Sequence, residues 1–593
     1  MEDLGTGDGS PYQILEDNDP EAAEQAVAAV PSPSVAVPAS LHGSLMARLD
    51  RLGPAKEVAQ IGAAIGREFS HMLLVAVARK PEAEAASALD RLVASGLVIR
   101  QGMPPQASYA FKHALVRDAA YGTLLRGKRK ELHGNIAHGL ENQFPEIVET
   151  QPDLLAQHCA EAGLVENAVA YWLKAGQRTV ARGAMVEAVA QLRKGLHLLP
   201  SVADNAVRQE QELNLQIALG HSQLATKGYS APEPGTAFAR ARELCEQLNR
   251  SAQLGSVLRG QFVYCLVRGE LEQAQNLADE LRHLGEAKNE VMWKCFGLMY
   301  QGNISCWLGK FTEARAFYEN ALSLWDPKYS AFAATPEHPY VASLCHLSRA
   351  LLCLGHVDQA RSRRDEALAQ ARPLPLYNSV FVQVQAWWGI DWVIAGGKPE
   401  QAMLRSAEDV LAISREQGFS QWLAVGTILH GWCLGTTGQP AEGIQRLLKG
   451  ITISRAAGVK IVLPFCLMTL AEVYGQAGQP EEGLKRIAEA AELVETTKER
   501  WAEAEIHRMR GTLLMSMHEY AAAEDNYHRA LAVARQQQAK FWELRAALSL
   551  ARLWGDQGKP QQGRNLLAPV YGWFKEGFDI RDLKEAKALL EAT

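Results

Sequence analysis

The sequence predicts a mainly α-helical protein in which a small domain of helices and one β-hairpin precedes a long solenoid of helical hairpins. Two observations carry this prediction. A short phrase recurs between Gly269 and Gly558, with steps of 40, 46, 42, 41, 40, 40 and 40 residues. Before it, between residues 41 and 140, amphipathic helical segments are followed by two short strand segments around a Gly-Met-Pro-Pro turn. A fixed period of this size is typical of stacked helical hairpins.

The recurring phrase consists of a turn residue, a skipped position, an apolar residue or proline, and a small residue three positions further on. Glycine can adopt the left-handed conformation that ends one helix, and proline suits the first turn of the next because its missing N–H has no helical partner there. The small residue lets the two helices approach closely. The turn positions are Gly269, Gly309, Gly355, Gly397, Gly438, Gly478, His518 and Gly558.

Two copies extend the phrase with small and aromatic residues at the same offsets. One contains Gly302 and Tyr318, and the other contains Gly511 and Tyr527. We expect the aromatic residue of one hairpin to fill the gap left by its neighbour's alanine. These offsets resemble the tetratricopeptide repeat, whose period is about 34 residues. Because the step here is longer, we expect longer helices in a tetratricopeptide-like α-solenoid superhelix over residues 141–593.

Residues 1–40 differ in composition from the rest of the chain. They hold eight acidic and no basic residues, several glycines and prolines, and few large apolar groups. Such a segment buries too little apolar surface to offset chain entropy, so we expect a disordered acidic leader. The alternative is a remnant of a domain that lies upstream in longer relatives.

The cellular location follows from what the sequence lacks. The acidic N-terminus does not resemble a secretory signal, and no apolar run reaches the roughly 20 residues of a membrane helix. Nine cysteines are scattered singly, with no Cys-x-x-Cys pair, and are interpreted as reduced apolar fillers. We therefore expect a cytoplasmic protein with no membrane partner.

Residues 41–140 predict a winged-helix-like domain, because three helices are followed by a two-stranded wing. Serine and proline mark the first two helix starts, and apolar spacing marks the third helix. The expected elements are helices from Ser40 to Leu52, from Pro54 and over residues 82–95, strands over 96–99 and 108–111, and a helix from about His113.

Winged helices often bind DNA through basic and amide side chains directed at base edges and phosphates. The helix before the predicted wing offers only Arg91 outward and carries three acidic residues, while the basic cluster of residues 126–130 lies on the helix after the wing. A solvated face or a partner surface accounts for these charges. We do not expect a nucleic-acid partner, and a winged-helix DNA-binding regulator stays as an alternative.

Longer stretches of the chain resemble a known family. Ala59-Gln-Ile-Gly-Ala-Ala-Ile-Gly-Arg-Glu-Phe69 and Tyr109-Ala-Phe-Lys-His-Ala-Leu-Val-Arg-Asp-Ala-Ala-Tyr121 look like the segment that follows the ATPase module in bacterial signalling ATPases of the STAND class. Many of those proteins begin with a class III adenylate/guanylate cyclase domain and end in tetratricopeptide-like repeats. The resemblance covers nearly everything from residue 40 to the C-terminus and implies the C-terminal part of such a protein.

Neither catalytic module of that family can be recognised in the sequence. A P-loop needs Gly-x4-Gly-Lys-Ser/Thr, so that backbone amides cradle phosphates, lysine reaches the outer phosphates and the hydroxyl holds magnesium. No such string occurs, and no strand-rich segment with two metal-binding carboxylates predicts a cyclase domain. We expect a chain that is not an enzyme, with no catalytic residue, cofactor or metal.

His113 is the one candidate site residue. In the related ATPases a Met-His-Asp motif of the winged helix contacts bound ADP and helps to hold the off state. Phe111-Lys-His113-Ala-Leu-Val-Arg-Asp118 stands where that motif would be, with Ala114 in place of its aspartate. The resemblance implies that His113 contacts a nucleotide only when another chain supplies the ATPase. The alternative is that His113 caps its helix.

Two other groups of residues allow more than one interpretation or lack a functional pattern. One group of aromatic residues could form a ligand-stacking cluster, but its helical spacing favours a place in the core: Phe381, Trp387, Trp388 and Trp392. One group of histidines lacks the spacing of metal ligands: His338, His346 and His356.

Three functions are compatible with these patterns. The first is a noncatalytic regulatory or scaffold protein of signal transduction, whose concave repeat surface binds a protein or a small effector. The second is a trans-acting or truncated subunit of an ATP-dependent adenylate/guanylate cyclase or transcriptional regulator, with an ATPase or cyclase chain as partner. The third is the DNA-binding regulator.

Overall fold

The structure is a computed structural model that describes residues 39–326, 338–374, 381, 383–385, 387 and 401–591. The chain divides into two compact units. Unit 1 holds residues 1–148 and 161–163, and unit 2 holds residues 149–160 and 164–593. The predicted leader, apart from its last two residues, and the predicted turn at Gly397 lie outside the described residues.

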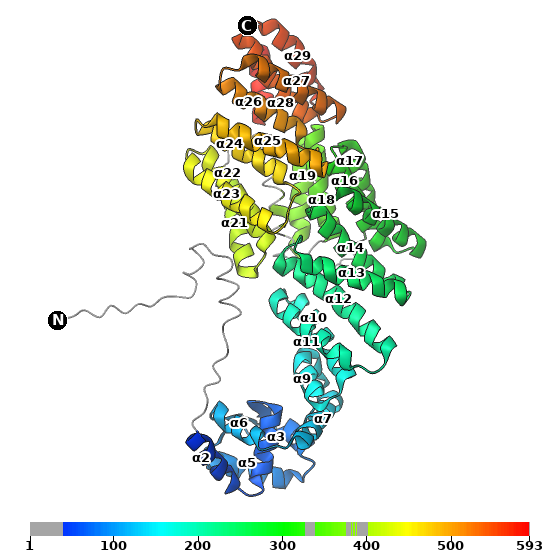
Figure 1. Ribbon diagram of the computed structural model, residues 1–593, viewed down its shortest axis with the longest axis vertical. Helices are drawn as coiled ribbons and strands as arrows, with labels where there is room; N and C mark the ends of the chain where they lie inside the picture. The colour runs from blue at the N-terminus through cyan, green and yellow to red at the C-terminus, as the bar shows by residue number, and fades with distance from the viewer. Residues whose placement is uncertain are drawn as a thin grey trace, which may run out of the picture. The chain divides into compact units, whose positions relative to one another are not determined.

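Unit 1 combines short helices with a three-stranded antiparallel sheet (Figure 1). A strand and a helix that were not predicted, β1 and α4, lie between the second and third predicted helices. The elements are α2 (Ala39–Asp50), α3 (Ala55–Ile65), β1 (Glu68–Ser70), α4 (His71–Ala78), α5 (Glu82–Ala94), β2 (Val98–Gln101), β3 (Ser108–Phe111), α6 (Ala114–Gly122) and α7 (Arg126–Gln143).

The sheet of unit 1 has the order β1-β3-β2, so that the last strand in sequence lies in the middle. Phe69 of β1 pairs with Tyr109 of β3, and their rings stack with centroids 5.8 Å apart. A side chain at Gly62 of α3 would lie 2.7 Å from the Phe69 ring, so glycine lets α3 lie directly against β1. The buried aromatic side chains therefore join the helices to the sheet.

Unit 2 is a tetratricopeptide-like α-solenoid built from antiparallel helix pairs. Two helices, α8 (Pro145–Thr150) and α9 (Pro152–Ala162), precede the pairs. Residues 165–374, here called the first half, contain α10 (Val165–Ala181), α11 (Met185–Leu198), η2 (Leu199–Ser201), α12 (Asn205–Lys227), α13 (Pro232–Gln247), α14 (Ser251–Val267), α15 (Leu271–Lys288), α16 (Val291–Trp307), α17 (Phe311–Leu324), α18 (Pro339–Leu354) and α19 (Val357–Ala371).

Residues 401–591, here called the second half, continue the same pattern. Its helices are α21 (Gln401–Gln417), α22 (Ser420–Thr436), α23 (Pro440–Ala456), α24 (Leu463–Gln476), α25 (Pro480–Thr497), α26 (Glu503–Ser516), α27 (Tyr520–Gln536), α28 (Lys540–Asp556), α29 (Pro560–Trp573) and α30 (Arg581–Glu591).

The predicted hairpin turns are confirmed in the described residues. Gly269, Gly309 and Gly355 have φ of 74°, 77° and 93°, in the left-handed region that favours glycine. In each of these copies the next helix begins two residues later. His518 takes the same conformation with φ of 64°, and its exposed imidazole Nδ1 lies 2.9 Å from the Tyr520 hydroxyl.

The predicted aromatic residues do fill gaps between helices, but each gap lies at a glycine of the same helix pair and not at an alanine of the neighbouring one. Tyr318 lies over Gly302 of its own helix pair, where an added Cβ would be 2.6 Å from the ring. Tyr527 lies over Gly511 in the same way, again at 2.6 Å. Glycine rather than a neighbour's alanine makes the gap, because residues 16 positions apart face each other across one hairpin.

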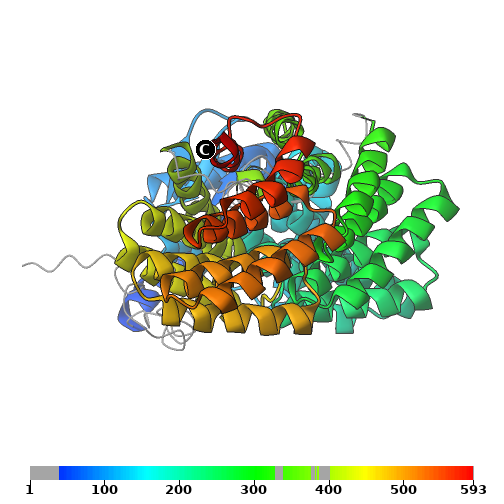
Figure 2. The ribbon, with the colours of Figure 1, turned by 90° about the horizontal axis from the view of Figure 1, so that it is seen from above.

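The two halves of the solenoid lie side by side. Figures 1 and 2 show α13–α17, in green, next to α22–α29, in yellow to red. Hydrogen bonds join residues far apart in the sequence: Ser230 Oγ donates to the Ala457 carbonyl, 227 residues away, and Asp358 N–H donates to Glu576 Oε1 at 3.2 Å, 218 residues away. We call this boundary between the halves the seam.

The seam repeats with the period of the solenoid. The Val267 carbonyl, at the end of α14, accepts from the Lys460 and Ile461 amides at 2.9 and 3.2 Å. Forty residues further on in both halves, the Trp307 carbonyl at the end of α16 accepts from the Arg500 and Trp501 amides at 2.8 and 3.2 Å. The last carbonyls of a helix have no partner within it, so the second half caps the ends of α14 and α16.

Crowding at the turn glycines differs between the two halves. A Cβ at Gly269 would lie 2.8 Å from Thr497 Cγ2, and one at Gly309 would lie 2.5 Å from Gln537 Nε2. A Cβ at Gly438 or Gly478 would meet nothing within 4 Å. First-half glycines therefore serve both the left-handed turn and the close seam, whereas second-half glycines serve the turn alone.

This difference predicts unequal effects of the same substitution. Gly269 and Gly478 both have φ of 74°, so replacement by alanine carries the same backbone strain, about 1–2 kcal/mol. Gly269→Ala should lower the free energy of unfolding by about 1–3 kcal/mol more than Gly478→Ala, because its methyl group also crowds Thr497. Chemical denaturation of both variants measures this difference, and equal losses would contradict the seam.

Candidate functional site

A cavity of about 110 Å³ lies inside unit 2 where the two halves meet. Its first-half wall includes Tyr229, which follows α12, and Trp307, the last residue of α16. Its second-half wall includes Trp422 of α22 and Ile461, in the loop before α24. The same loop makes the seam bonds to Val267, so the cavity exists only while the halves are in contact.

Aromatic rings follow one another along the cavity wall. Trp422 contacts Tyr229 with centroids 6.3 Å apart and Trp387 with centroids 6.0 Å apart, both edge to face. Trp387 continues the row to Trp307 at 6.1 Å, and Trp307 meets Trp501 at 5.7 Å. Edge-to-face pairs at such distances are favourable beyond the area they bury. The row therefore forms a preorganised aromatic wall.

A buried arginine lies behind this wall. The Arg349 side chain is 1% exposed, and its guanidinium carbon lies 4.5 Å from the ring centroid of Trp387, 5.5 Å from that of Trp307 and 5.3 Å from that of Trp501. A desolvated cation over indole faces is attracted by the ring quadrupole, which offsets part of its burial cost. Arg349 thus fixes the orientation of three tryptophans.

His346 also lines the cavity and lies beside these rings. Its ring lies 5.3 Å from that of Trp387 and is stacked at 6.1 Å with that of Tyr318. Burial, together with the positive charge of Arg349, lowers the pKa of His346 to about 3. The imidazole is therefore neutral at physiological pH.

The loop before α24 carries an unusual backbone conformation. Val462 has φ of 70°, and a β-branched residue in the left-handed region is strained by on the order of 1–3 kcal/mol. Its amide donates to both carboxylate oxygens of Glu499, at 3.1 and 3.0 Å, and the Trp501 indole N–H donates to Glu499 Oε1 at 2.7 Å. These hydrogen bonds hold the strained loop against the cavity.

Glu499 is itself buried, with 1% of its surface exposed. Burial raises the pKa of Glu499 to about 8, although the bonds from Trp501 and Val462 and the charge of Arg349 act in the opposite direction. The carboxyl group is thus mainly protonated at neutral pH, and its charge changes within a physiologically accessible range.

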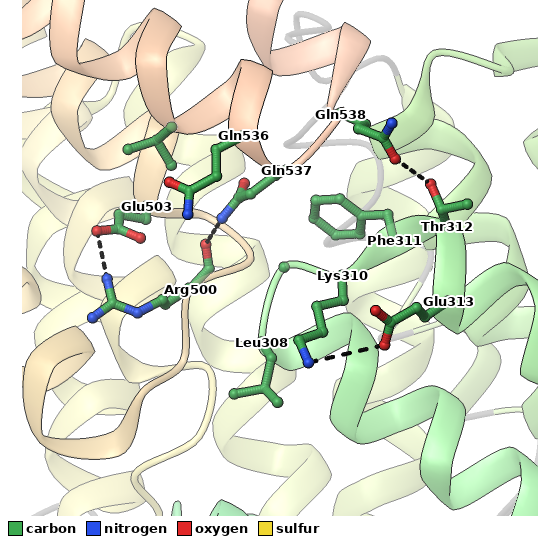
Figure 3. Close-up of a pocket in the computed structure, with 12 residues that line it drawn as sticks. Leu308, Lys310, Phe311, Thr312, Glu313, Arg500, Glu503, Gln536, Gln537 and Gln538 are labelled. Atoms are coloured by element: carbon green, nitrogen blue, oxygen red, sulfur yellow. Dashed lines mark hydrogen bonds and ion pairs between the residues drawn. The ribbon is translucent and has the colours of Figure 1, made fainter.

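A second hollow, of about 360 Å³, lies on the seam at Gly309. Figure 3 shows its polar lining: Arg500 pairs with Glu503 at 2.8 Å, and the Gln537 side-chain amide donates to the Arg500 carbonyl at 2.8 Å. Lys310 and Glu313 lie 3.9 Å apart on the other side. This cleft is larger than the aromatic cavity, but its charged groups are already paired with one another, and the exposed Lys310–Glu313 pair contributes little.

His113 lies at the start of α6, directly after β3. It occupies the N-cap position, yet its side chain makes no capping hydrogen bond and is exposed. The alternative that its side chain caps the helix is therefore not supported. The nucleotide role stays a prediction.

The structure separates the other predicted groups. Trp387 belongs to the cavity wall, whereas Trp388 and Trp392 lie outside the described residues. The three histidines contact different aromatic rings: His338 contacts Trp325, His346 contacts Tyr318 and Trp387, and His356 contacts Trp573. In the part of the chain that the structure describes, no group of three or more potential metal ligands occurs.

The cysteines agree with their interpretation as reduced apolar fillers. All nine cysteines are free and buried. Burial raises the pKa of Cys466 in the cavity wall to about 12, so its thiol is neutral. Among the described helices, none is both long and apolar enough to cross a membrane.

A curated protein matches part of this chain. No family model matches the chain. An uncharacterized protein of Rhizobium meliloti (strain 1021), R02095, is 26% identical over 484 residues, which is 79% of this chain and 46% of that protein. The chain thus spans about half the length of this relative.

Solved structures of helical-repeat proteins are similar at low identity. The anaphase-promoting complex heterotetramer Cut9–Hcn1 has a TM-score of 0.42 at 10% identity and covers 88% of this chain and 91% of that chain. The STAND protein PH0952 of Pyrococcus horikoshii, which has a tetratricopeptide repeat sensor, has a TM-score of 0.26 at 12% identity. The match covers 88% of this chain and 63% of that chain. A Rap conjugation gene regulator of plasmid pLS20 in complex with the Phr* peptide has a TM-score of 0.37 at 12% identity, and the match covers 71% of this chain and 97% of that chain. At such scores, function has to be argued from this chain's own residues.

The buried carboxyl group predicts a pH-dependent stability. Folding raises the pKa of Glu499 from its ordinary 4.5 to about 8. The contribution of the protonated carboxyl group to the free energy of unfolding is therefore complete below pH 4.5 and is lost as pH rises through 8. Thermal unfolding between pH 5 and 9 should show the wild type losing up to about 1.4 kcal/mol per pH unit relative to Glu499→Gln. The exposed Glu313→Gln serves as control, and parallel curves for wild type and Glu499→Gln would contradict this assignment.

Proposed function

We propose that this chain is a noncatalytic regulatory protein of signal transduction that binds a protein or a small effector through its helical repeats. The observation that carries the proposal is the cavity that both halves of the solenoid line, with Trp307 on one side and Trp422 on the other. A ligand that contacts both halves binds their closed arrangement more tightly than an open one. Binding is thereby coupled to the arrangement of the repeats.

We further propose that residues 41–140 form a winged-helix-like domain before repeats that occupy residues 141–593. The order α3, β1, α4, α5, β2, β3 and the antiparallel sheet support this assignment. Arg91 is exposed on α5, but Glu82 and Glu84 of the same helix are exposed as well. These acidic groups disfavour a DNA phosphate backbone, so the domain is better suited to a protein partner.

The kinship that we propose is with the C-terminal part of STAND-class signalling proteins, acting in the cytoplasm. Its support is the word matches over residues 59–69 and 109–121, together with the order of a helix-and-sheet unit before the repeats. The Rhizobium relative, of which the match occupies less than half, supports a kinship with longer chains.

The proposal predicts that the purified chain turns over neither ATP nor GTP and makes no cyclic nucleotide. Its sequence has no phosphate-cradling loop, and such a loop supplies electrostatic stabilisation that helix pairs do not replace. Product formation by the full chain with magnesium and either nucleotide measures this directly. Steady hydrolysis that copurifies with the folded chain would contradict the proposal.

A second candidate function is that of a trans-acting subunit of an ATPase or cyclase. The side chain of His113 favours this function, because it is exposed and makes no capping hydrogen bond. Its imidazole is therefore accessible to a nucleotide held by another chain. His113→Ala should then shift the nucleotide-bound equilibrium of an ATPase partner without changing the circular dichroism of this chain. Ala substitution of His197, an exposed histidine of α11, is the control. An unchanged partner response to His113→Ala would exclude this role.

A further inference from the structure

The chemistry of the cavity wall restricts what the cavity can hold. Among the described residues that line it, none is an aspartate, glutamate, lysine or arginine. His346 is neutral, as shown above, and Cys466 keeps its thiol proton. An ionised ligand would lose its hydration without gaining a counter-charge from the wall. Burying an unpaired charge in this way costs on the order of several kcal/mol. The cavity therefore selects uncharged molecules.

The wall also restricts ligand shape. Trp307, Trp387 and Trp422 present ring faces and edges at fixed angles, and Tyr229 closes the row. Flat aromatic molecules match such a wall because they add offset or edge-to-face contacts at little cost in ligand entropy. The volume of about 110 Å³ is slightly below that of an engineered apolar cavity of about 150 Å³ that binds benzene. A single six-membered ring fits this size.

Polar side chains of the wall can orient a ligand, among them Asn303, Gln383 and Gln421. Ser454 Oγ donates to the Gly450 carbonyl at 3.0 Å, so its hydrogen is already engaged. Asn303 Oδ1 accepts from the Tyr318 hydroxyl at 2.8 Å, which leaves the Asn303 amide N–H groups as its contribution to the cavity. A ligand with one acceptor oxygen at the edge of its ring would complement this donor.

From these observations we propose that the cavity binds a neutral, single-ring aromatic molecule carrying a hydroxyl or carbonyl group. This inference rests on the proposed function, since it names the class of small effector. The ligand would contact Trp307 of the first half and Trp422 of the second, and would cover the strained loop at Val462. Occupancy would stabilise the closed seam by mass action, because the open arrangement has no such cavity.

The test uses the full chain and 4-fluorophenol, observed by ¹⁹F NMR line broadening. We expect saturable binding of 4-fluorophenol and at least about tenfold weaker binding of 4-fluorobenzoate and 4-fluorobenzylammonium, which have similar size but carry charge. Hydrogen exchange should slow at residues 459–463 when 4-fluorophenol is bound. No binding of 4-fluorophenol at millimolar concentration, or equal binding of the three probes, would overturn the inference.

Matched variants locate the site. Val425 of α22 lines the cavity and Val533 of α27 lines the polar seam cleft, and both side chains are half-buried. Val425→Phe fills the cavity and should weaken 4-fluorophenol binding at least about tenfold, whereas Val533→Phe should leave it unchanged. Equal effects of the two substitutions would place the ligand elsewhere.

A second variant keeps the test decisive if Val425→Phe does not fold. Ile428→Ala enlarges the cavity and should admit the bicyclic 5-fluoroindole about tenfold more tightly than the wild type does. An unchanged affinity for 5-fluoroindole would count against the site. Failure of all these binding tests in a chain that turns over no nucleotide would sink only this inference, whereas nucleotide turnover would sink the proposed function and leave the cavity result standing.

Discussion

The capping of first-half helix ends by second-half amides is the interaction on which the rest of unit 2 depends. Helix carbonyls at Val267 and Trp307 would otherwise end without partners, and a solenoid without such bonds contacts only its sequence neighbours. Here first-half residues also bond to second-half residues, from 193 positions away (Val267 and Lys460) to 227 positions away (Ser230 and Ala457). The solenoid is therefore stabilised across its turns as well as along them.

The aromatic cavity is a consequence of this seam. The loop that donates to Val267 is the same loop that places Ile461 and Val462 against the cavity. Glu499 holds Val462 in its strained conformation, and the neighbouring Trp501 donates to Glu499 while its own amide bonds Trp307. Backbone capping, a buried carboxyl group and the aromatic wall thus form one connected structure, and a change at any of them reaches the others.

The period of the solenoid could be predicted from sequence because each turn glycine acts locally, through its own φ and the helix start two residues later. The seam could not, because its partners lie far apart in the sequence, from 193 residues for Val267 and Lys460 to 227 residues for Ser230 and Ala457, and no local pattern records them. Of the cavity residues, the sequence patterns point to Trp387, as part of an aromatic group, and to His346, as a histidine without metal-ligand spacing. The sequence does carry a signal for the cavity residues of α22. This helix contains no charged residue, and a helix that is apolar all round is buried on all sides.

The central claim is that the two halves meet in this register, and a disulfide across the seam tests it most directly. A Cβ at Gly458 would lie 3.7 Å from Ser230 Cβ, within the roughly 3.5–4.5 Å that a disulfide requires. Mild oxidation of Ser230→Cys/Gly458→Cys, followed by peptide mass spectrometry, should therefore show a cross-link between positions 230 and 458. The control pair Ser230→Cys/Gly438→Cys uses another left-handed turn glycine with nothing within 4 Å and should not cross-link. Absence of the first cross-link, or equal yields from both pairs, would contradict the account.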